Sequence, residues 1–219
     1  MNVFDIIGPI MIGPSSSHTA GAVRIGRIAR KVLNDEPANI EIQLAGSFAE
    51  TYRGHGTDKA LLAGCMGMLP DDERIRNAFE LADERKIDYR FSKINLSDCH
   101  PNTAVIKLTG NSGKRCEIQG ASVGGGNILV TAVDGMEVEF TGQNDTILVR
   151  HYDRPGAIAA VTNFMMYSGV NINNFRLSRK KKGGEALMMI EVDGNAPENL
   201  EAQIEMVPDV IDAIFIKAI

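Results

Sequence analysis

Four short polar segments hold most of the residues in this chain that could do chemistry. They are Gly13–Thr19 (GPSSSHT), Gly54–Ala60 (GHGTDKA), His100–Thr103 (HPNT) and Ser122–Asn127 (SVGGGN). They contain three of the four histidines of the chain. Histidine is well suited to moving protons near neutral pH, and hydroxyl groups and glycine amides suit an anion. If the fold brings the segments together, they predict a site for acid–base chemistry on a small anionic substrate.

The GPSSSHT segment leads into a predicted amphipathic helix over about residues 17–34, where apolar residues recur at helical spacing. The unpaired amides at a helix start carry a partial positive charge that favours a carboxylate or a phosphate. Neighbouring hydroxyls would add hydrogen bonds to such an anion. The alternative interpretation is that one serine caps the helix and the others are solvated.

The other three segments place histidines and glycines in predicted loops. His55 lies between two glycines in the polar stretch 50–59, which we expect to be a loop ahead of a helix. Glycine permits close approach of a ligand, and a histidine there could transfer protons, although a surface histidine is the alternative. His100 leads into a predicted strand. The three glycines of SVGGGN either line a pocket with bare amides or form a loop or bulge.

The composition argues against several classes of protein. The net charge of −5 argues against a nucleic acid or an anionic membrane surface as partner. No stretch approaches the roughly 20 apolar residues of a membrane span, and the N-terminus lacks the features of a signal peptide. The three cysteines are widely spaced without a C-x-x-C pair, so neither a zinc site nor a disulfide framework is indicated. We expect a cytoplasmic protein with no metal ligands in this chain.

Hydrophobic periodicity predicts an α+β protein with domains at 1–143 and 146–219. In the first, mixed α+β domain we expect helices over 17–34, after 59 and over 71–86, and strands over 39–46, 89–96, 103–109, 115–122, 127–133 and 136–140. The second domain has the predicted order βαββαβ, which is the ferredoxin-like arrangement. Its strands are expected at 146–151, 170–178, 185–192 and 210–217, and its helices at 156–168 and 197–206.

The second domain carries a D-R-P-G turn between its first strand and first helix, and G-V-N-I opens its second strand. This combination resembles the ACT domain, a small regulatory module. The resemblance implies self-association through sheet edges and an amino-acid ligand at the turn, formed by Asp153, Arg154, Pro155 and Gly156. The alternative is a dimerisation domain without a ligand.

The four polar segments, in this order, resemble the beta chain of the iron–sulfur-dependent L-serine dehydratases. The first domain is also similar to the allosteric-substrate-binding domain of some phosphoglycerate dehydrogenases. The resemblance implies a lyase that deaminates L-serine to pyruvate and ammonia. It further implies a [4Fe-4S] cluster ligated by a separate alpha chain, which would be the partner of this chain.

The resemblance also suggests roles for individual residues. His55 is the first choice for the base that removes the α-proton of serine, and His18 is the second. The residues expected to bind or assist the substrate are Ser15, Ser16, Ser17, Thr19, Lys59, Gly124, Gly125 and Gly126. His100 and Asn102 are candidates for a separate effector site.

Two other functions remain as alternatives. The chain could be a non-catalytic, amino-acid-sensing regulatory subunit of the same enzyme, in which the histidines tune affinity. It could also be a Ser/His hydrolase, although the sequence lacks a G-x-S-x-G nucleophile elbow and a defined third partner for the serine.

Overall fold

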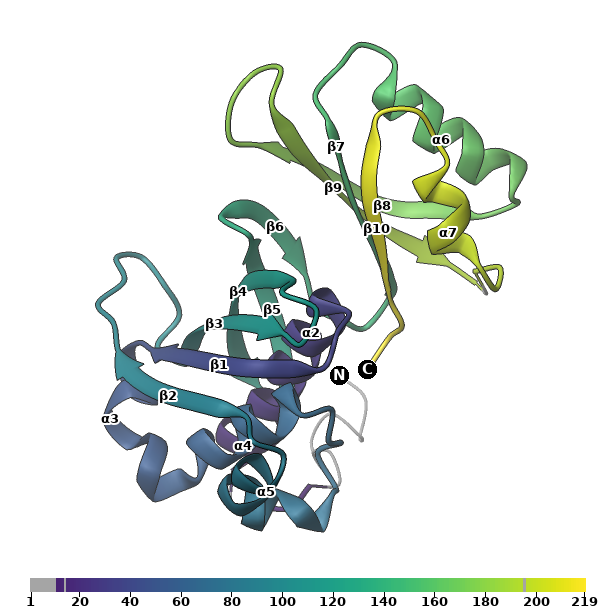
Figure 1. Ribbon diagram of the computed structural model, residues 1–219. Coiled ribbons are helices and arrows are strands. Elements are labelled where there is room, and N and C mark those ends of the chain that lie inside the picture. Colours follow the sequence, from purple (N-terminus) through teal and green to yellow (C-terminus); the bar gives the residue numbers. More distant parts are fainter. Residues whose placement is uncertain (1–10, 14, 195) are drawn as a thin grey trace. The chain divides into compact units, whose positions relative to one another are not determined.

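The computed structural model describes residues 11–13, 15–194 and 196–219 (Figure 1). Pro14 of the GPSSSHT segment and the N-terminal residues 1–10, on which the signal-peptide expectation depends, lie outside the described residues. The chain divides into two compact units between Asp134 and Gly135. This division falls in a hairpin turn, ahead of the stretch 141–145 where we expected the boundary.

The first unit and the hairpin that follows it combine helices with one six-stranded sheet, so the expected α+β class is confirmed. The elements are η1 (Ser16–Gly21), α2 (Ala22–Leu33), β1 (Pro37–Leu44), α3 (Gly46–His55), α4 (Thr57–Cys65), η2 (Glu73–Asn77), α5 (Ala78–Glu84), β2 (Asp88–Lys93), β3 (Thr103–Gly110), β4 (Arg115–Gly124), β5 (Asn127–Val133) and β6 (Met136–Phe140). The strand order is β2-β1-β3-β4-β5-β6. Strands β1 and β2 run parallel, whereas β1, β3, β4 and β5 pair antiparallel in that order.

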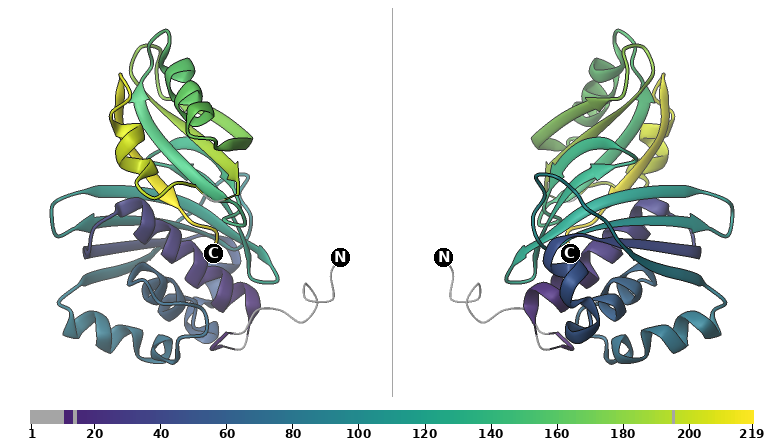
Figure 2. Two further views of the ribbon diagram at one scale, coloured as in Figure 1. Left: turned by 90° about the vertical axis from the view of Figure 1, so that its right-hand side faces the viewer. Right: turned by 90° about the vertical axis from the view of Figure 1, so that its left-hand side faces the viewer.

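One face of this sheet is covered by helices (Figure 1, Figure 2). In β1 the apolar residues Ile40, Ile42 and Leu44 alternate with polar ones and are fully buried. Helix α2 packs against β3 and β4, and α4 packs against α2 and β1. The alternating strand pattern and the apolar stripe of α2 therefore share one core.

Helices α2 and α4 approach closely because both carry a glycine at the contact. A Cβ atom added at Gly26 would lie 2.4 Å from the carbonyl oxygen of Leu61. A Cβ atom added at Gly64 would lie 2.2 Å from the carbonyl oxygen of Val23. No side chain fits at either position, so these glycines set the distance between the two helices that follow the polar segments.

The stretch 50–59 is not the loop that we expected. Helix α3 runs through to His55, Gly56 ends it in the left-handed conformation with φ of 70°, and α4 begins at Thr57. Gly54 and Gly56 suggested a flexible loop, but the first is tolerated within the last helical turn and the second serves as the cap. The position of His55 is therefore fixed by a helix end.

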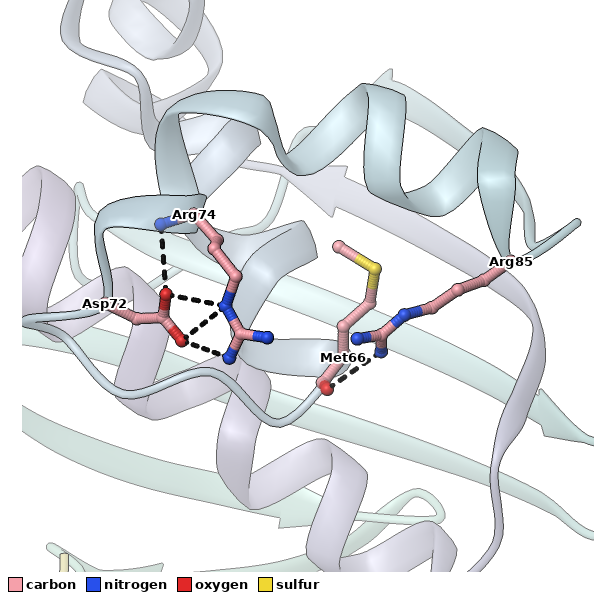
Figure 3. Close-up of polar contacts among 4 residues, drawn as sticks. All are labelled: Met66, Asp72, Arg74 and Arg85. Carbon is pink, nitrogen blue, oxygen red and sulfur yellow. Dashed lines mark hydrogen bonds and ion pairs between the residues drawn. The ribbon is translucent and has the colours of Figure 1, made fainter.

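The predicted helix over 71–86 is split into η2 and α5, and polar contacts hold the chain that leads to it (Figure 3). Asp72 caps η2 by accepting a hydrogen bond from the backbone N–H of Arg74, whose guanidinium also forks onto the same carboxylate. From the end of α5, Arg85 donates to the carbonyl oxygen of Met66, just after α4. These contacts fix the ends of the segment that presents Phe79.

The second unit begins with β6, and the rest of it has the predicted βαββαβ order. The elements of this part are β7 (Asp145–Tyr152), α6 (Ala157–Tyr167), β8 (Asn171–Arg179), β9 (Glu185–Asp193), α7 (Leu200–Glu205) and β10 (Val210–Ile216). The sheet order is β10-β7-β9-β8, and all of its neighbouring strands are antiparallel. Apolar residues of the two helices and of the strands form the core of this unit, among them Ile147, Val161 and Ile190. This is the expected ferredoxin-like arrangement.

Candidate active site

His18 lies in η1, a π-helical turn that opens the first helical segment. Ser15 caps this turn, and its hydroxyl accepts a hydrogen bond from the backbone N–H of His18 at 3.3 Å. The same hydroxyl lies 3.4 Å from Nδ1 of the imidazole. On the other side of the ring, Oγ1 of Thr51 in α3 lies 3.2 Å from Nε2. Both ring nitrogens of His18 therefore have a hydroxyl partner, from Ser15 and from α3.

These contacts select one tautomer of His18. The hydroxyl of Thr51 donates its single proton to the carbonyl oxygen of Ser47 at 2.8 Å, so it can only accept from the imidazole. Nε2 therefore carries the proton, and Nδ1 accepts from the hydroxyl of Ser15. The assignment follows from the hydrogen-bond network.

The ring of His55 meets the ring of His18 edge to face, with centroids 4.7 Å apart. His55 is exposed at the end of α3, and its imidazole forms no hydrogen bond with any residue in the described ranges. The ring of Phe48, on the same helix, also meets the ring of His18 edge to face, with centroids 5.3 Å apart. Helix α3 thus supplies three contacts to His18 through residues spaced three and four positions apart.

The environment of His18 favours its neutral form. Partial burial lowers the pKa of the His18 imidazole below its usual value, and the neighbouring His55 lowers it further. A second positive charge beside a desolvated imidazole is unfavourable, because each charged ring raises the energy of the other. His18 is therefore a neutral hydrogen-bonding group at neutral pH.

The structure joins the HPNT and SVGGGN segments to each other and to this region. The backbone N–H of Ser122 donates to the carbonyl oxygen of Asn102, and that of Phe48 donates to Pro101. Ser122 is fully buried against Gly21, where an added Cβ atom would lie 2.1 Å from the serine hydroxyl. All four polar segments are therefore linked, from η1 through α3 and the HPNT loop to the end of β4.

The hydroxyl groups of the GPSSSHT segment have different surroundings. Ser15, Ser16 and Ser17 are half-buried, whereas Thr19 is buried. The loop at Gly13 covers Thr19, since a Cβ atom there would lie 2.2 Å from the threonine hydroxyl. The three serines remain accessible at the start of the helix, and Thr19 serves packing beneath the loop. Of the four residues whose hydroxyls were expected to bind an anion, the three serines are partly exposed and Thr19 is not.

The glycines of SVGGGN form a tight hairpin between β4 and β5. Gly125 and Gly126 are its two central residues, with φ of 60° and 81°, which is the geometry that favours glycine at both positions. The carbonyl oxygen of Gly126 accepts a hydrogen bond from the guanidinium of Arg24 at 2.7 Å. The loop interpretation therefore describes these residues, and Arg24 holds the hairpin on α2.

Lys59 makes its polar contact with the segment ahead of α5. Its ammonium group donates to the carbonyl oxygen of Arg76 at 2.7 Å and lies 5.7 Å from the ring centroid of Phe79. The structure thus engages Lys59 between α4 and α5, because its position at the start of α4 directs it toward that side. The expectation that it assists the substrate stays a prediction.

His100 and Asn102 lie together on the HPNT loop, and within the described residues neither side chain forms a hydrogen bond with His18. The Nδ1 atom of His100 accepts a hydrogen bond from the backbone N–H of Asn102 at 3.1 Å, and His100 is exposed. The side-chain amide of Asn102 lies 3.5 Å from the carbonyl oxygen of Ser122. The pair forms the exposed side of the HPNT loop.

The D-R-P-G turn of the second unit is held by ion pairs. Asp153 accepts from Arg179 and from the backbone N–H of Gly183, and these bonds lower the pKa of its carboxyl group. Arg154 pairs with Asp209 at 2.6 Å. Pro155 and Gly156 are exposed, and Gly156, with φ of 94°, precedes the first residue of α6. The charged side chains of the turn therefore stabilise its shape.

The side chains of this chain do not form a metal site in the ranges that the structure describes. No group of three or more histidine, cysteine, aspartate or glutamate side chains there is close enough to hold a metal ion. Cys65 and Cys116 are buried, and Cys99 lies in the loop before His100. Burial raises the pKa of the Cys65 thiol far above its usual value, which disfavours the thiolate that a cluster needs. These cysteines do not fit an iron–sulfur cluster.

Two site residues were missed by the sequence analysis. Thr51 and Phe48 both contact His18 from α3, but the expected loop over 50–59 hid the helical spacing that places them beside His55. The available signal was the spacing of Phe48, Thr51 and His55 at i, i+3 and i+7, which indicates one helix face.

The fold and the site define a protein with two neighbouring histidines, contributed by two of the polar segments, in its first unit and an ACT domain in its second. Residues 146–209 match the ACT domain, and residues 2–133 match the family described as serine dehydratase beta chain. The chain belongs to the serine dehydratase beta chain family.

Curated relatives agree with this family. The chain is 44% identical over 210 residues to the "Probable L-serine dehydratase, beta chain" of Bacillus subtilis, covering 96% of this chain and 95% of that protein. It is 38% identical over 204 residues to the "L-serine dehydratase, beta chain" of Peptoniphilus asaccharolyticus, covering 93% and 92%. It is also similar to the D-3-phosphoglycerate dehydrogenase of Methanocaldococcus jannaschii, with 29% identity and coverage of 89% and 37%.

The described helices give no sign of a membrane span. None of them is both long enough and apolar enough to cross a bilayer.

Proposed function

We propose that this chain is the beta subunit of an L-serine ammonia-lyase, which deaminates L-serine to pyruvate and ammonia together with an alpha chain. The observation that carries the proposal is the linkage of all four polar segments around the His18–His55 pair, in a chain of the serine dehydratase beta chain family. The names of the two beta-chain relatives support the substrate and the reaction.

In this proposal His55 is the general base. A base needs an accessible lone pair, and His55 is exposed, with an imidazole that makes no hydrogen bond with other described residues. Both nitrogens of His18 are engaged by Ser15 and Thr51, so His18 positions the pair and stays neutral. The base takes the Cα proton of serine as the β-hydroxyl leaves. The resulting enamine tautomerises to an imine, and water hydrolyses this imine to pyruvate and ammonia.

The serine hydroxyls at the start of the first helical segment are proposed to bind the carboxylate of the substrate. Ser16 and Ser17 are partly exposed there and can donate to the carboxylate, and the helix start adds partial positive charge. The hydroxyl of Ser15 donates its proton to Nδ1 of His18, so Ser15 contributes by holding the imidazole and the start of the helical segment in place. Holding the carboxylate beside His55 would place Cα within reach of the base. The bare amides near Gly125 are proposed as a further wall of this pocket.

The [4Fe-4S] cluster is proposed to belong to the alpha chain. The cysteines described above do not fit a cluster, so this chain supplies the base and the anion-binding wall, and no step is assigned here to the metal. The test is an anaerobic assay of pyruvate formation with each chain alone and with both together. Activity that requires both chains supports the proposal. Full activity of the alpha chain alone would contradict it.

The alternative role is a regulatory subunit that senses an amino acid. His100 and Asn102 could then form an effector site, since His100 is exposed on the HPNT loop. Rapid-quench measurement of the chemical step separates the two roles. A normal chemical step in His55→Gln, with only the serine dependence altered, would favour the sensor.

We also propose that the ACT domain mediates self-association. Strands β8 and β10 form the two edges of its sheet, and an unpaired edge can accept a strand from a second copy. Light scattering of the full chain and of a chain truncated near Thr146 tests this. An unchanged oligomeric mass after truncation would contradict the role.

A further inference from the structure

The first unit contains a second hollow, separate in its lining from the histidine pair. It has a volume of about 490 Å³, and its lining residues come from α3, the start of α4, α5 and β2. These four elements are labelled in Figure 1. Its lining residues are Tyr52, Arg53, Asp58, Phe79, Tyr89 and Phe91. None of these residues belongs to the carboxylate-binding or base residues proposed above.

Aromatic rings form the walls of this hollow. Tyr52 stacks on Phe91 with centroids 6.3 Å apart, and Phe79 stacks on Tyr89 at 5.6 Å. Phe79 and Phe91 meet edge to face at 6.2 Å, which joins the two stacks. Of the five phenylalanines and tyrosines described within residues 11–134, four are gathered here, and each of them remains partly exposed.

This concentration is unusual for a chain with only 5% aromatic residues. Aromatic side chains contribute most to a core when they are fully buried, as Phe48 is. Four partly exposed rings around a hollow offer instead a flat apolar surface for a ligand. Tyr89 and Phe91 point to the same side of the edge strand β2, which is why they line the hollow together.

Two residues of the lining, Asp58 and Arg53, carry opposite charges. Asp58 is 8% exposed, and its carboxylate accepts a hydrogen bond from the backbone N–H of Lys59 at 2.8 Å. Within the described ranges it has no ion pair. Burial raises the pKa of its carboxyl group, and the nearby charges of Lys59 and Arg53 offset this effect only in part. Arg53 is exposed, and its guanidinium lies 5.5 Å from the ring centroid of Tyr52, again without a carboxylate partner in the part of the chain described.

We propose that this hollow is a binding site for a zwitterionic α-amino acid with an aromatic or large apolar side chain. Asp58 would receive the α-ammonium group, Arg53 the α-carboxylate, and the rings of Phe79, Tyr89 and Phe91 the side chain. The assignment uses each unpaired charge of the lining once.

Simpler ligands match the lining less well. A plain amine would leave the guanidinium of Arg53 without a partner, and a plain carboxylate would leave the buried carboxylate of Asp58 without one. The charge of Lys59 also acts on Asp58, but its ammonium group is directed to the carbonyl oxygen of Arg76 and to the ring of Phe79 and forms no ion pair with Asp58. A two-headed ligand satisfies both charges.

The site has a direct mechanical connection to the histidine pair. Tyr52 and Arg53 lie on α3, the helix that also carries Thr51 and His55. A ligand that holds Tyr52 and Arg53 would also hold the helix on which the contacts with His18 depend. Binding is nevertheless a property of this chain alone, so its test does not depend on the proposed lyase activity.

The experiment uses 4-fluoro-L-phenylalanine and the full chain, with ¹⁹F NMR of the ligand as readout. We expect the resonance to broaden and shift on addition of protein. Arg53→Gln, an exposed change, is expected to weaken binding by about tenfold or more, because it removes a charge-assisted contact. Asp58→Asn should do the same. The matched controls are Arg90→Gln and Asp88→Asn, which remove the same charges from strand β2 without touching the lining.

Analogues test the two-headed character. Replacing the amino acid with 4-fluorophenethylamine removes the carboxylate, and 3-(4-fluorophenyl)propionate removes the ammonium group. Each is expected to bind at least about tenfold more weakly. The proposal is overturned if the amino acid causes no broadening at millimolar concentration. It is also overturned if either analogue binds equally well, or if Arg53→Gln and the Arg90→Gln control bind alike, which would place the ligand elsewhere, for instance on the ACT domain.

Discussion

The rings of His18 and His55 lie edge to face, with planes inclined by 86° and centroids 4.7 Å apart. The two residues differ in their burial and in their hydrogen bonds. His18 is partly buried and hydrogen-bonded through both nitrogens, whereas His55 is exposed at the end of α3. This asymmetry separates a positioning role for His18 from a proton-transfer role for His55, and the predictions begin from it.

Replacement of His55 should affect turnover more than replacement of His18. In the complex with the alpha chain, His55→Gln is expected to lower kcat by about 10²- to 10⁴-fold, the usual contribution of a general base. His18→Gln should lower it less, since glutamine can still bond to Thr51. Pyruvate formation under anaerobic conditions gives both values. The control is Lys114→Gln, an exposed change just before β4, at the opposite end of that strand from the SVGGGN segment. A larger loss in His18→Gln than in His55→Gln would reverse the roles.

The hydroxyl of Thr51 should affect turnover, although it is not among the groups proposed to contact the substrate. Thr51→Val keeps the shape of the side chain but removes the acceptor for Nε2 of His18. We expect kcat to fall by roughly fivefold to tenfold, the equivalent of about one hydrogen bond. We also expect the pH profile of kcat to shift, because the tautomer of His18 is no longer fixed. Thr51→Ser should restore both, and failure of this rescue would indicate a packing role.

The stability of the chain should fall on acidification below pH 6.5 in a way that depends on His18. Its pKa in the folded protein is lowered by burial and by His55, so the unfolded chain binds a proton first as the pH falls. The stabilising contribution is complete above pH 6.5 and is lost progressively as the pH drops toward the folded pKa. Urea unfolding at pH 7.5 and 5.0 should show a smaller difference for His18→Gln than for the wild type. An identical difference would contradict the linkage.

Much of the fold could be predicted from the sequence, because the local signals of each element agree with the way that element packs. The alternation of Ile40, Ile42 and Leu44 marked a half-buried strand, and the turn chemistry of Asp134-Gly135 marked a hairpin. In the second unit the six elements follow from hydrophobic periodicity alone. Each of these signals depends on residues close together in the chain.

The site could be predicted from the sequence only in part. The segments predicted which residues gather, but the role of Gly56 as a helix cap was hidden by its resemblance to a loop glycine. This error concealed Thr51 and made His55 a loop residue. The direction of Lys59 could not be predicted, because it is set by the carbonyl oxygen of Arg76 and the ring of Phe79, which the fold brings near.

The close contact of α2 and α4 should not tolerate a side chain. Gly64→Ala would place a methyl group 2.2 Å from the carbonyl oxygen of Val23, a backbone atom that cannot turn away. We expect a loss of about 1–3 kcal/mol in the free energy of unfolding, as for other overpacked cores. Urea unfolding measures it. Gly67→Ala is less suitable as a control because of its positive φ, whereas Gly54→Ala has open space within α3 and should cost little.

Asp58 should be a residue that the chain keeps at the expense of stability. Burial raises the pKa of its carboxyl group, so the folded state resists the charged form more than the unfolded state does. The penalty is fully present above the folded pKa and disappears as the pH falls toward the unfolded value of 3.8.

Asn retains the acceptor for the backbone N–H of Lys59, so Asp58→Asn should raise the free energy of unfolding at pH 7. The gain should shrink as the pH is lowered, and the exposed control Asp88→Asn should show no such gain. Urea unfolding from pH 8 to about pH 4 checks both, because the window of change ends near the unfolded pKa. A stabilised variant that has lost its affinity for 4-fluoro-L-phenylalanine would identify Asp58 as a ligand-binding carboxylate. A destabilised Asp58→Asn would instead assign the carboxylate a role in holding the start of α4.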